Sequence, residues 1–253
     1  VDADHRYPQE AHDALVKAGL FAAHVPTEFG GDGADALAAC LIIEEVARVC
    51  ASASLIPAVN KLGSLPLILS GSKEQKERWL RPLAQGKGFS YCLSESEAGS
   101  DASALKTKAE RKGDGWVING SKKWISNAGE SQFYTVIAQT DPSLGSKGIT
   151  AFVLEKSDSG VSFGAPEKKM GFRGSPTREV YFDNVEIGDD RRISEVGKGF
   201  ALAMDTLDHT RITIAAQALG LAQGALDVAT KYAHERKQFD KPIFDFQAVQ
   251  FML

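Results

Sequence analysis

The hydrophobic pattern changes near residues 89 and 197, and these two changes limit the chain to a multidomain α+β fold. Residues 1–88 carry apolar side chains at helical spacing. Residues 89–196 consist of short runs rich in Val, Ile, Thr, Phe and Tyr, separated by turn dipeptides, and residues 197–253 return to helical spacing. We therefore predict a helical N-terminal domain, a middle β domain built as a small barrel or sandwich, and the beginning of a C-terminal helical bundle.

Three helices are predicted in the first block. The first covers about 8–19, between a proline that favours a helix start and a glycine that favours a helix end. The second covers about 34–55. The third begins at Ser72, which with Gln75 forms a capping-box sequence, and we expect Pro82 to end it.

Seven short strands are predicted in the middle block. The dipeptides Asp114-Gly115 and Asn119-Gly120 are typical of hairpin turns. The expected strands are 105–112, 116–118, 121–125, 132–140, 148–155, 161–166 and 178–187.

The third block contains a seven-residue apolar repeat that predicts one long helix. The repeat consists of Phe200, Met204, Leu207, Ile214, Ala218, Leu221, Ala225, Val228 and Tyr232. Such a seam needs a partner helix, so we expect at least one more helix and interpret the chain as a fragment, or the ordered part, of a longer protein. Arg211 also lies on the seam. It can pair with Asp208 on the helix surface, but a seam position favours a polar ligand or a buried partner.

Composition excludes several classes of function. The chain has 253 residues, 43% of them hydrophobic, and a net charge of -4 without a basic run, which argues against nucleic acid as a partner. Its three cysteines form no CxxC pair, so neither a disulfide framework nor a zinc site is expected. The first residues lack signal-peptide character and no uninterrupted apolar run is long enough to span a bilayer, so we expect a cytoplasmic protein with no membrane partner.

The sequence does not support dinucleotide binding through a glycine-rich loop, metal catalysis or a serine hydrolase. Residues 31–36, GDGADA, match a relaxed dinucleotide fingerprint, but no buried strand precedes them and no acidic residue follows at the required distance. They are interpreted as a loop that leads into a helix. The five histidines show no metal-ligand spacing and no Gly-x-Ser-x-Gly motif exists, so metalloenzyme and hydrolase functions are disfavoured.

Three other stretches leave two interpretations open. SESEAGSD, residues 94–101, has the small residues of a ligand-holding loop, yet its carboxylates would repel a phosphate, and a surface turn explains it as well. GSKKWISN, residues 120–127, contains either a half-buried Trp before a turn or an aromatic side chain and a hydroxyl that face a flat ring. The cations of 236–239 can simply complement a helix C-terminus.

Taken in order, YCLSESEAGSD, GSKKWISN, DHTR, ERKQFD and FQAVQ closely resemble the acyl-CoA dehydrogenase family of flavoproteins, as does GSKEQKERWLRPLAQG in the first block. The resemblance covers nearly the whole chain. It implies an FAD cofactor and oxidation of an acyl-CoA to the trans-2-enoyl-CoA. Electrons would pass to an electron-transfer flavoprotein, and the protein would be a homo-oligomer, a tetramer or a dimer. Short or medium acyl chains, branched ones included, are the expected substrates.

The resemblance also implies which residues bind. Ser94 would hydrogen-bond the pyrimidine edge of the flavin, the Ser126 hydroxyl would reach toward N5, and Ser100 would also border CoA. Asp208 and Arg211 would lie at the end of the CoA chain. The other expected cofactor contacts are Tyr91, Cys92, Leu93, Gly99, Trp124 and Ile125, with Arg236, Gln238, Phe239 and Gln247 reaching the FAD of a neighbouring subunit.

Two departures from the family pattern stand out. Many members have Pro after the loop glutamate, whereas Glu95 is followed by Ser96-Glu97, so a local difference in the turn is expected. Thr210 occupies the alternative position of the catalytic base and cannot act as one at neutral pH. The catalytic Glu is therefore expected beyond Leu253. Competing functions are a same-fold acyl-CoA oxidase, a flavin monooxygenase and a non-catalytic acyl-CoA- or protein-binding homologue.

Overall fold

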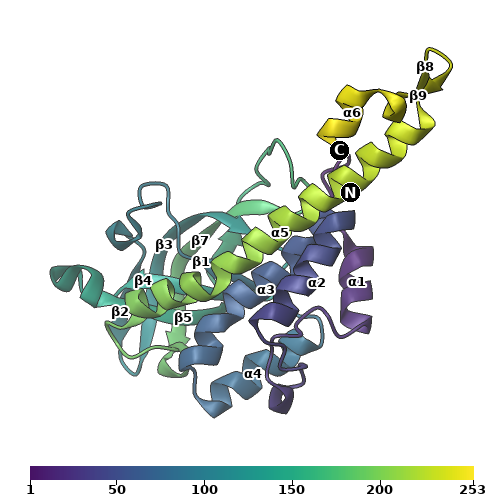
Figure 1. Cartoon of the computed structure of the whole chain (residues 1–253). Helices are drawn as coiled ribbons and strands as arrows, with labels where there is room; N and C mark the ends of the chain where they lie inside the picture. The colour runs from purple at the N-terminus through teal and green to yellow at the C-terminus, as the bar shows by residue number, and fades with distance from the viewer.

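Four helices form the first part of the computed structural model, which describes all 253 residues (Figure 1). They are α1 (Gln9–Lys17), α2 (Ala36–Val49), α3 (Ala51–Ser70) and α4 (Lys73–Ala84). The capping box of α4 is confirmed, because Ser72 Oγ accepts from Gln75 N and Gln75 Oε1 accepts from Ser72 N.

Two predicted helix boundaries are wrong. The helix expected over 34–55 is two helices, because Cys50 has an extended backbone (φ -150°) and ends α2 before α3 begins. Most of α3 is buried, so its sequence lacks the one-sided pattern that would have separated it from α2. In addition, α4 continues to Ala84, because Pro82 lies in its last turn and removes only one amide donor there.

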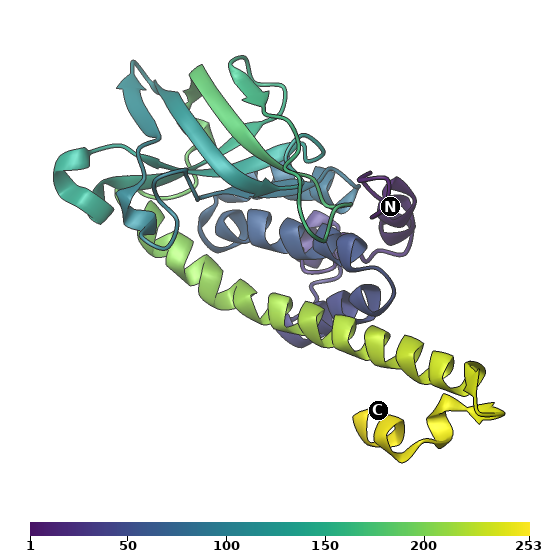
Figure 2. The ribbon, with the colours of Figure 1, turned by 90° about the horizontal axis from the view of Figure 1, so that it is seen from above.

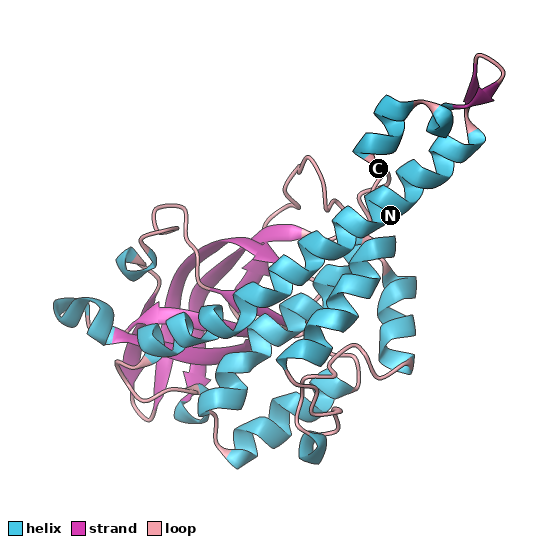
Figure 3. Cartoon of the chain, in the orientation of Figure 1, coloured by secondary structure: helices cyan, strands magenta, loops and turns pink.

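The middle part is a curled seven-stranded sheet that lies against the helices (Figure 3). Its strand order is β1-β4-β2-β3-β7-β6, with β5 paired to β4. The strands are β1 (Phe89–Cys92), β2 (Lys108–Lys112), β3 (Gly115–Ser126), β4 (Phe133–Gln139), β5 (Ile149–Glu155), β6 (Val161–Phe163) and β7 (Thr177–Gly188). β1, which the sequence did not predict, pairs with β4 in parallel.

The two turn dipeptides have different outcomes. At Asp114-Gly115 the hairpin is confirmed, since Lys112 pairs with Gly115 across β2 and β3. The hairpin at Asn119-Gly120 is wrong, because β3 continues through it with a shift of register against β7. Gly120 has a φ of 142° there, and a Cβ would lie 2.8 Å from the Cα of Thr107, so the glycine serves a bulge and a close approach.

The long helix α5 (Gly199–Glu235) is confirmed, and its predicted seam packs against the core at Phe200, Met204 and Leu207 but not over most of the remaining length. It crosses α2 and α3 and extends past them, with β8 (Lys237–Gln238), β9 (Lys241–Pro242) and α6 (Gln247–Met252) at its far end (Figures 1 and 2). The seam residues Ile214, Val228 and Tyr232 are 52%, 71% and 56% exposed. The buried face instead carries small and polar residues: Ala203, Thr206, Thr210, Thr213, Ala216, Gln217 and Gly220.

Close contact between α2 and α5 explains why small residues form this face. A Cβ at Gly220 would lie 2.1 Å from the backbone oxygen of Glu44. The backbones of the two helices therefore approach closely, and the packed face of α5 is the one with small side chains rather than the one with large apolar side chains.

Two helices, α3 and α5, are long and apolar enough to cross a membrane by length and composition alone. In α3, 72% of the most apolar window is buried within the protein, as in the core helix of a globular domain. For α5 the corresponding share is 17%.

The helical part and the sheet share one hydrophobic core. Its 22 buried residues include Trp79 of α4, Phe89 of β1 and Ala203 of α5, while a second cluster of 15 residues lies within the sheet. Because this shared core crosses the boundaries that we predict at residues 88/89 and 196/197, the division into three domains stays a prediction.

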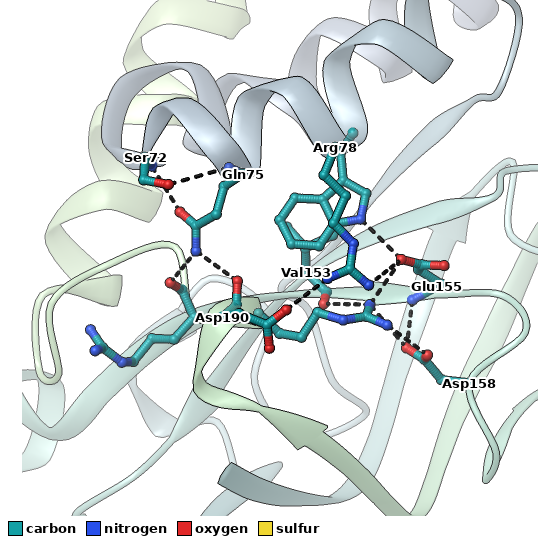
Figure 4. A network of polar contacts seen from close by, with 10 residues as sticks. Ser72, Gln75, Arg78, Val153, Glu155, Asp158 and Asp190 are labelled. Atoms are coloured by element: carbon teal, nitrogen blue, oxygen red, sulfur yellow. Dashed lines mark hydrogen bonds and ion pairs between the residues drawn. The ribbon is translucent and has the colours of Figure 1, made fainter. Parts of the chain in front are cut away.

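A polar network joins α4 to the sheet (Figure 4). Arg191 is its centre: the guanidinium lies 3.3 Å from Glu155 and 3.1 Å from Asp158, with only 11% of the side chain exposed. From α4, Arg78 contacts Glu155 at 3.2 Å, and the Trp79 indole donates to the same carboxylate at 3.1 Å. The Glu155 carboxylate of β5 thus binds Arg78 and Trp79 of the helical part as well as Arg191, which follows the sheet.

Replacing Arg191 should destabilise the protein. In Arg191→Met, Glu155 and Asp158 keep their partly buried charges but lose a shared cation, so we expect the free energy of unfolding to fall by about 2–3 kcal/mol. Urea denaturation measures the change. Arg6→Met, which removes an exposed pair with Glu10, is the matched control and should leave stability within error. Equal stability of Arg191→Met and the control would contradict the role of the network.

Candidate flavin site

Two adjoining pockets lie where α3, the sheet and α5 meet. The first, of about 190 Å³, is lined by Val59, Leu62, Tyr91, Leu93, Ser94, Trp124, Ile125, Ser126 and Leu207. The second, of about 280 Å³, shares four of these residues and adds Leu55, Ala58, Thr210, Arg211, Thr213 and Ile214. The walls are thus mostly apolar, with a few hydroxyls and one guanidinium, which is typical of a small-molecule site.

Trp124 lines the first pocket because β3 changes register beside it. The register against β7 shifts between Lys122 and Ile125, and Trp124 itself has a φ of 64°. This left-handed backbone is strained for a bulky side chain and costs on the order of 1–3 kcal/mol. The indole is 56% exposed although it belongs to a strand of the sheet. Strain of this kind clusters at functional sites, and here it places the Trp124 indole in the lining of the pocket.

Tyr91 supplies a buried hydroxyl that has no partner. The residue is 8% exposed, and its Oη lies buried without a hydrogen bond. Burial, together with the neighbouring Cys92, raises the pKa of Tyr91 above the usual range, so the phenol remains protonated at neutral pH. Buried hydroxyls in folded proteins are normally satisfied, so a ligand with a polar atom would complete this one. With Trp124 and the serine hydroxyls nearby, the residues fit a flat conjugated ring that has a polar edge.

A buried ion pair fixes the loop that contributes Leu93 and Ser94. Lys122 of β3 is fully buried, and its Nζ lies 2.7 Å from Glu95 Oε1. The same ammonium donates to the Leu93 carbonyl at 3.0 Å, and Lys123 N donates to the Ser94 carbonyl at 2.8 Å. The Lys122–Glu95 pair therefore holds the pocket-lining loop against β3.

Glu95 also receives two backbone donors. Lys106 N and Thr107 N lie 2.6 and 3.0 Å from its carboxylate oxygens. Burial alone would raise the pKa of Glu95, but Lys122 and these donors together lower it below the ordinary value. Burial lowers the pKa of Lys122, and Glu95 opposes that shift. The first carboxylate of the SESEAGSD loop is therefore a structural anion whose charge is compensated by Lys122.

The rest of the loop is a tight exposed turn. Glu95 and Ala98 exchange both backbone hydrogen bonds, at 2.9 and 3.3 Å. Ser96 and Glu97 at its tip are exposed, so the surface-turn interpretation of the loop holds for these two residues. Gly99 and Ser100 are exposed as well, outside both pockets.

The predicted flavin residues are thus partly assembled. The first pocket gathers Tyr91, Leu93, Ser94, Trp124, Ile125 and Ser126. Cys92 points into the core of the sheet, and burial raises its pKa to about 12. The roles of Cys92, Gly99 and Ser100 stay predictions. The sequence analysis did not identify Glu95 and Lys122 as residues that support the site. The alternation along β3 could have indicated Lys122, because Trp116, Ile118 and Lys122 are all buried, even-numbered positions of this strand.

Arg211 is not buried as its seam position suggested. It is 68% exposed and pairs with Asp208, one turn earlier, at 2.6 Å. It still lines the second pocket, so its guanidinium is available to a ligand there. Thr210 is buried, and its hydroxyl donates to the Thr206 carbonyl at 2.7 Å. No Asp, Glu or His lines either pocket, so the two pockets contain no general base.

The last group of predicted residues lies far from the pockets. Arg236, Gln238, Phe239 and Gln247 are exposed and follow the C-terminal end of α5, where the chain turns back toward α6 (Figure 2). At 1.5 Å per residue, the helix places Arg236 about 44 Å from Leu207 of the pocket. A contact from Arg236 to a ligand in this chain's own pocket is therefore excluded.

The fold and the pocket define a helix–sheet–helix protein with a site for a flat, conjugated ligand. Family models for the N-terminal, middle and C-terminal domains of acyl-CoA dehydrogenases match residues 1–87, 90–185 and 197–253. The chain therefore belongs to the acyl-CoA dehydrogenase family.

Individual relatives agree with this assignment. The chain is 58% identical over 254 residues to a probable acyl-CoA dehydrogenase, fadE25, of Mycobacterium leprae, covering 100% of this chain and 65% of that protein. Butyryl-CoA dehydrogenase from Megasphaera elsdenii superposes with a TM-score of 0.94 at 39% identity, over 99% of this chain and 67% of that one. An acyl-CoA dehydrogenase complexed with FAD from Bacillus anthracis superposes with a TM-score of 0.88 at 34% identity, over 94% of this chain and 41% of that one. The chain thus spans about 65% of the length of its first curated relatives.

A double-mutant cycle tests the buried pair. Lys122→Met should lower the free energy of unfolding by about 3–5 kcal/mol, because it leaves Glu95 charged and buried. Adding Glu95→Gln should recover about 1–3 kcal/mol, because the stranded charge is removed as well. Urea unfolding followed by tryptophan fluorescence measures both. Lys112→Met, at the exposed pair with Glu186, is the control. Strictly additive effects would show that the two residues do not act as a pair.

The same pair makes a prediction about pH. Because the pKa of Glu95 lies below its ordinary value of 4.5 in the folded state, its stabilising charge is fully present above pH 4.5. That stabilisation is lost as the pH falls through the lowered folded pKa. The stability difference between the wild type and Glu95→Gln should therefore narrow in acid, and a difference that widens there would contradict the assignment.

Proposed function

We propose that the full-length protein is an FAD-dependent acyl-CoA dehydrogenase that converts an acyl-CoA to the trans-2-enoyl-CoA and passes electrons to an electron-transfer flavoprotein. The observation that carries the proposal is the first pocket, where an exposed, strained Trp124 shares the lining with Ser94, Ser126 and Tyr91, whose buried hydroxyl has no partner. Family membership and the FAD in a related structure support it.

FAD, when bound, supplies the two-electron acceptor that no side chain provides. In our proposal Leu93 and Ser94 hold the pyrimidine edge of the ring, while Trp124 and Ser126 cover its other side. The apolar side chains of Val59, Leu62 and Leu207 exclude water. Exclusion of water matters because it strengthens the hydrogen bonds that orient the thioester beside the ring.

The second pocket is the proposed acyl site. Its walls come from α3 and α5, with Ser126 of β3, and its volume of about 280 Å³ is small for a ligand pocket, which favours short acyl chains over long ones. The butyryl-CoA specificity in the name of a related structure is consistent with this preference. Arg211, held by Asp208, is proposed to contact the CoA part, and Ser100 to border it.

The alpha proton needs a base that the pockets do not contain. Thr210 donates its hydroxyl to the backbone and lacks a suitable pKa. We propose that the base is a carboxylate in the part of the relatives' length that this chain does not span.

Arg236, Gln238, Phe239 and Gln247 are proposed to contact the FAD of a neighbouring subunit. The separation of about 44 Å between Arg236 and Leu207 of the pocket supports an arrangement in which residues of one subunit complete the site of another. A homo-oligomer, a tetramer in our proposal, follows from this arrangement. We place the protein in the cytoplasm, with no nucleic-acid or membrane partner.

Anaerobic titration of the full-length protein tests this function. The purified protein should be yellow, and butyryl-CoA should bleach its flavin absorbance. Arg211→Gln should need at least about tenfold more butyryl-CoA, since one charge-assisted contact is worth about 1.5–3 kcal/mol, while Arg6→Gln should behave as the wild type.

Three outcomes would contradict the proposal. A colourless protein would exclude a flavin enzyme, and a yellow protein that ignores every acyl-CoA in a panel would favour a non-catalytic homologue. Bleaching followed by rapid recolouring in air would favour an oxidase or monooxygenase.

A further inference from the structure

The ammonium of Lys123 lies over the indole ring of Trp124. Its Nζ is 5.1 Å from the ring centroid, which is within the distance of about 6 Å at which a cation is attracted to an aromatic face. The two residues occupy the register shift between Lys122 and Ile125, where Trp124 has its left-handed backbone. Neighbours in a regular strand point to opposite faces of the sheet, so the irregular backbone is what brings these two side chains together.

A carboxylate on the neighbouring strand holds this ammonium in place. Glu179 of β7 lies 3.1 Å from Lys123 Nζ, and both side chains are 28% exposed. Glu179 also accepts a hydrogen bond from the Tyr181 hydroxyl. Tyr181, followed by Lys123, lowers the pKa of Glu179 below its ordinary value, so the carboxylate is charged at neutral pH. The ion pair thus restricts a lysine side chain that would otherwise sample many rotamers.

Lys123 contacts two residues of the first pocket, although it does not line that pocket itself. Its backbone N donates to the Ser94 carbonyl at 2.8 Å, and its ammonium lies over the Trp124 ring. Because the ammonium occupies one face of the indole, a ligand in the pocket can meet only the opposite face or an edge. The charge of Lys123 therefore reaches a ligand through the ring of Trp124.

We propose that Lys123 is a positioning residue of the flavin site, which holds the Trp124 indole in the pocket lining and withdraws electron density from its ring. The part of this inference that concerns the flavin rests on the proposed function. An indole polarised by a cation attracts an electron-rich ring more strongly than an electron-poor one. Lys123 should therefore favour the reduced flavin, which is richer in electrons than the oxidised one.

Midpoint potentials of the FAD-loaded, full-length protein test the proposal. In Lys123→Met the equilibrium constant for flavin reduction should fall about threefold, which is about 14 mV for a two-electron couple. Lys123→Arg keeps a cation for the ring and should keep the wild-type potential. Lys112→Met, which removes an exposed lysine paired with Glu186, is the matched control and should also keep it. An unchanged potential in Lys123→Met would overturn the proposal.

A double-mutant cycle with Trp124→Leu separates this role from a direct effect of charge on the flavin. If Lys123 acts through the indole, Lys123→Met should shift the potential much less in the Trp124→Leu background than in the wild type. Equal shifts in the two backgrounds would overturn the proposal.

Acrylamide quenching of tryptophan fluorescence tests the positioning role without the flavin. Trp79 and Trp116 are buried, so the difference between a protein and its Trp124→Phe counterpart reports the access of acrylamide to Trp124. Lys123→Met should increase this difference about twofold, because the indole loses the cation that holds it, whereas Lys123→Arg should leave it unchanged. Acrylamide is uncharged, so the lost charge does not itself alter the collisions.

The two measurements separate the inference from the proposed function. A colourless full-length protein would contradict the proposed function, and the quenching would then decide the role of Lys123. Equal quenching of Trp124 in Lys123→Met and the wild type would overturn that role.

Discussion

The buried pair between Lys122 and Glu95 is the interaction on which the site depends. It joins a strand to a loop that is remote in sequence, and the same ammonium binds the Leu93 carbonyl. Two backbone donors complete the carboxylate, so both charges are satisfied although little water reaches them. A pair of this kind is weak evidence for net stability, but it is strongly selective for one arrangement, because every alternative strands a buried charge. The positions of Leu93 and Ser94 follow from it.

Around that pair, the pocket combines segments that are individually ordinary. The register shift in β3 presents Trp124, the start of the sheet presents Tyr91, and α3 and α5 close the apolar side. The strain at Trp124 and the unsatisfied Tyr91 hydroxyl are both unfavourable without a ligand. We interpret them as the features of a site that its cofactor completes, which agrees with membership of the acyl-CoA dehydrogenase family.

Local patterns predicted the helix–sheet–helix order, the capping box at Ser72 and the length of α5, because those depend on neighbours in sequence. Other predictions were wrong because they concern features that depend on contacts between residues far apart in the sequence. Asn119-Gly120 has the composition of a hairpin, but pairing with β7 makes it a bulge. Beyond Leu207 most of the apolar seam of α5 stays exposed, because Gly220 and small residues on another face allow a closer approach to α2. Six residues of the family motifs line the first pocket. The pair between Glu95 and Lys122 could be recognised only from the folded structure.

A crystal structure of the full-length protein with FAD would test the central claim most directly. If the Lys122–Glu95 pair preorganises the site, the backbone of residues 93–98 should move by less than about 1 Å from the arrangement described here. The flavin ring should lie between Ser94 and Trp124, and the Tyr91 hydroxyl should gain a partner. A flavin bound elsewhere, or a loop that reaches the ring only after the Lys122–Glu95 pair has broken, would contradict the account.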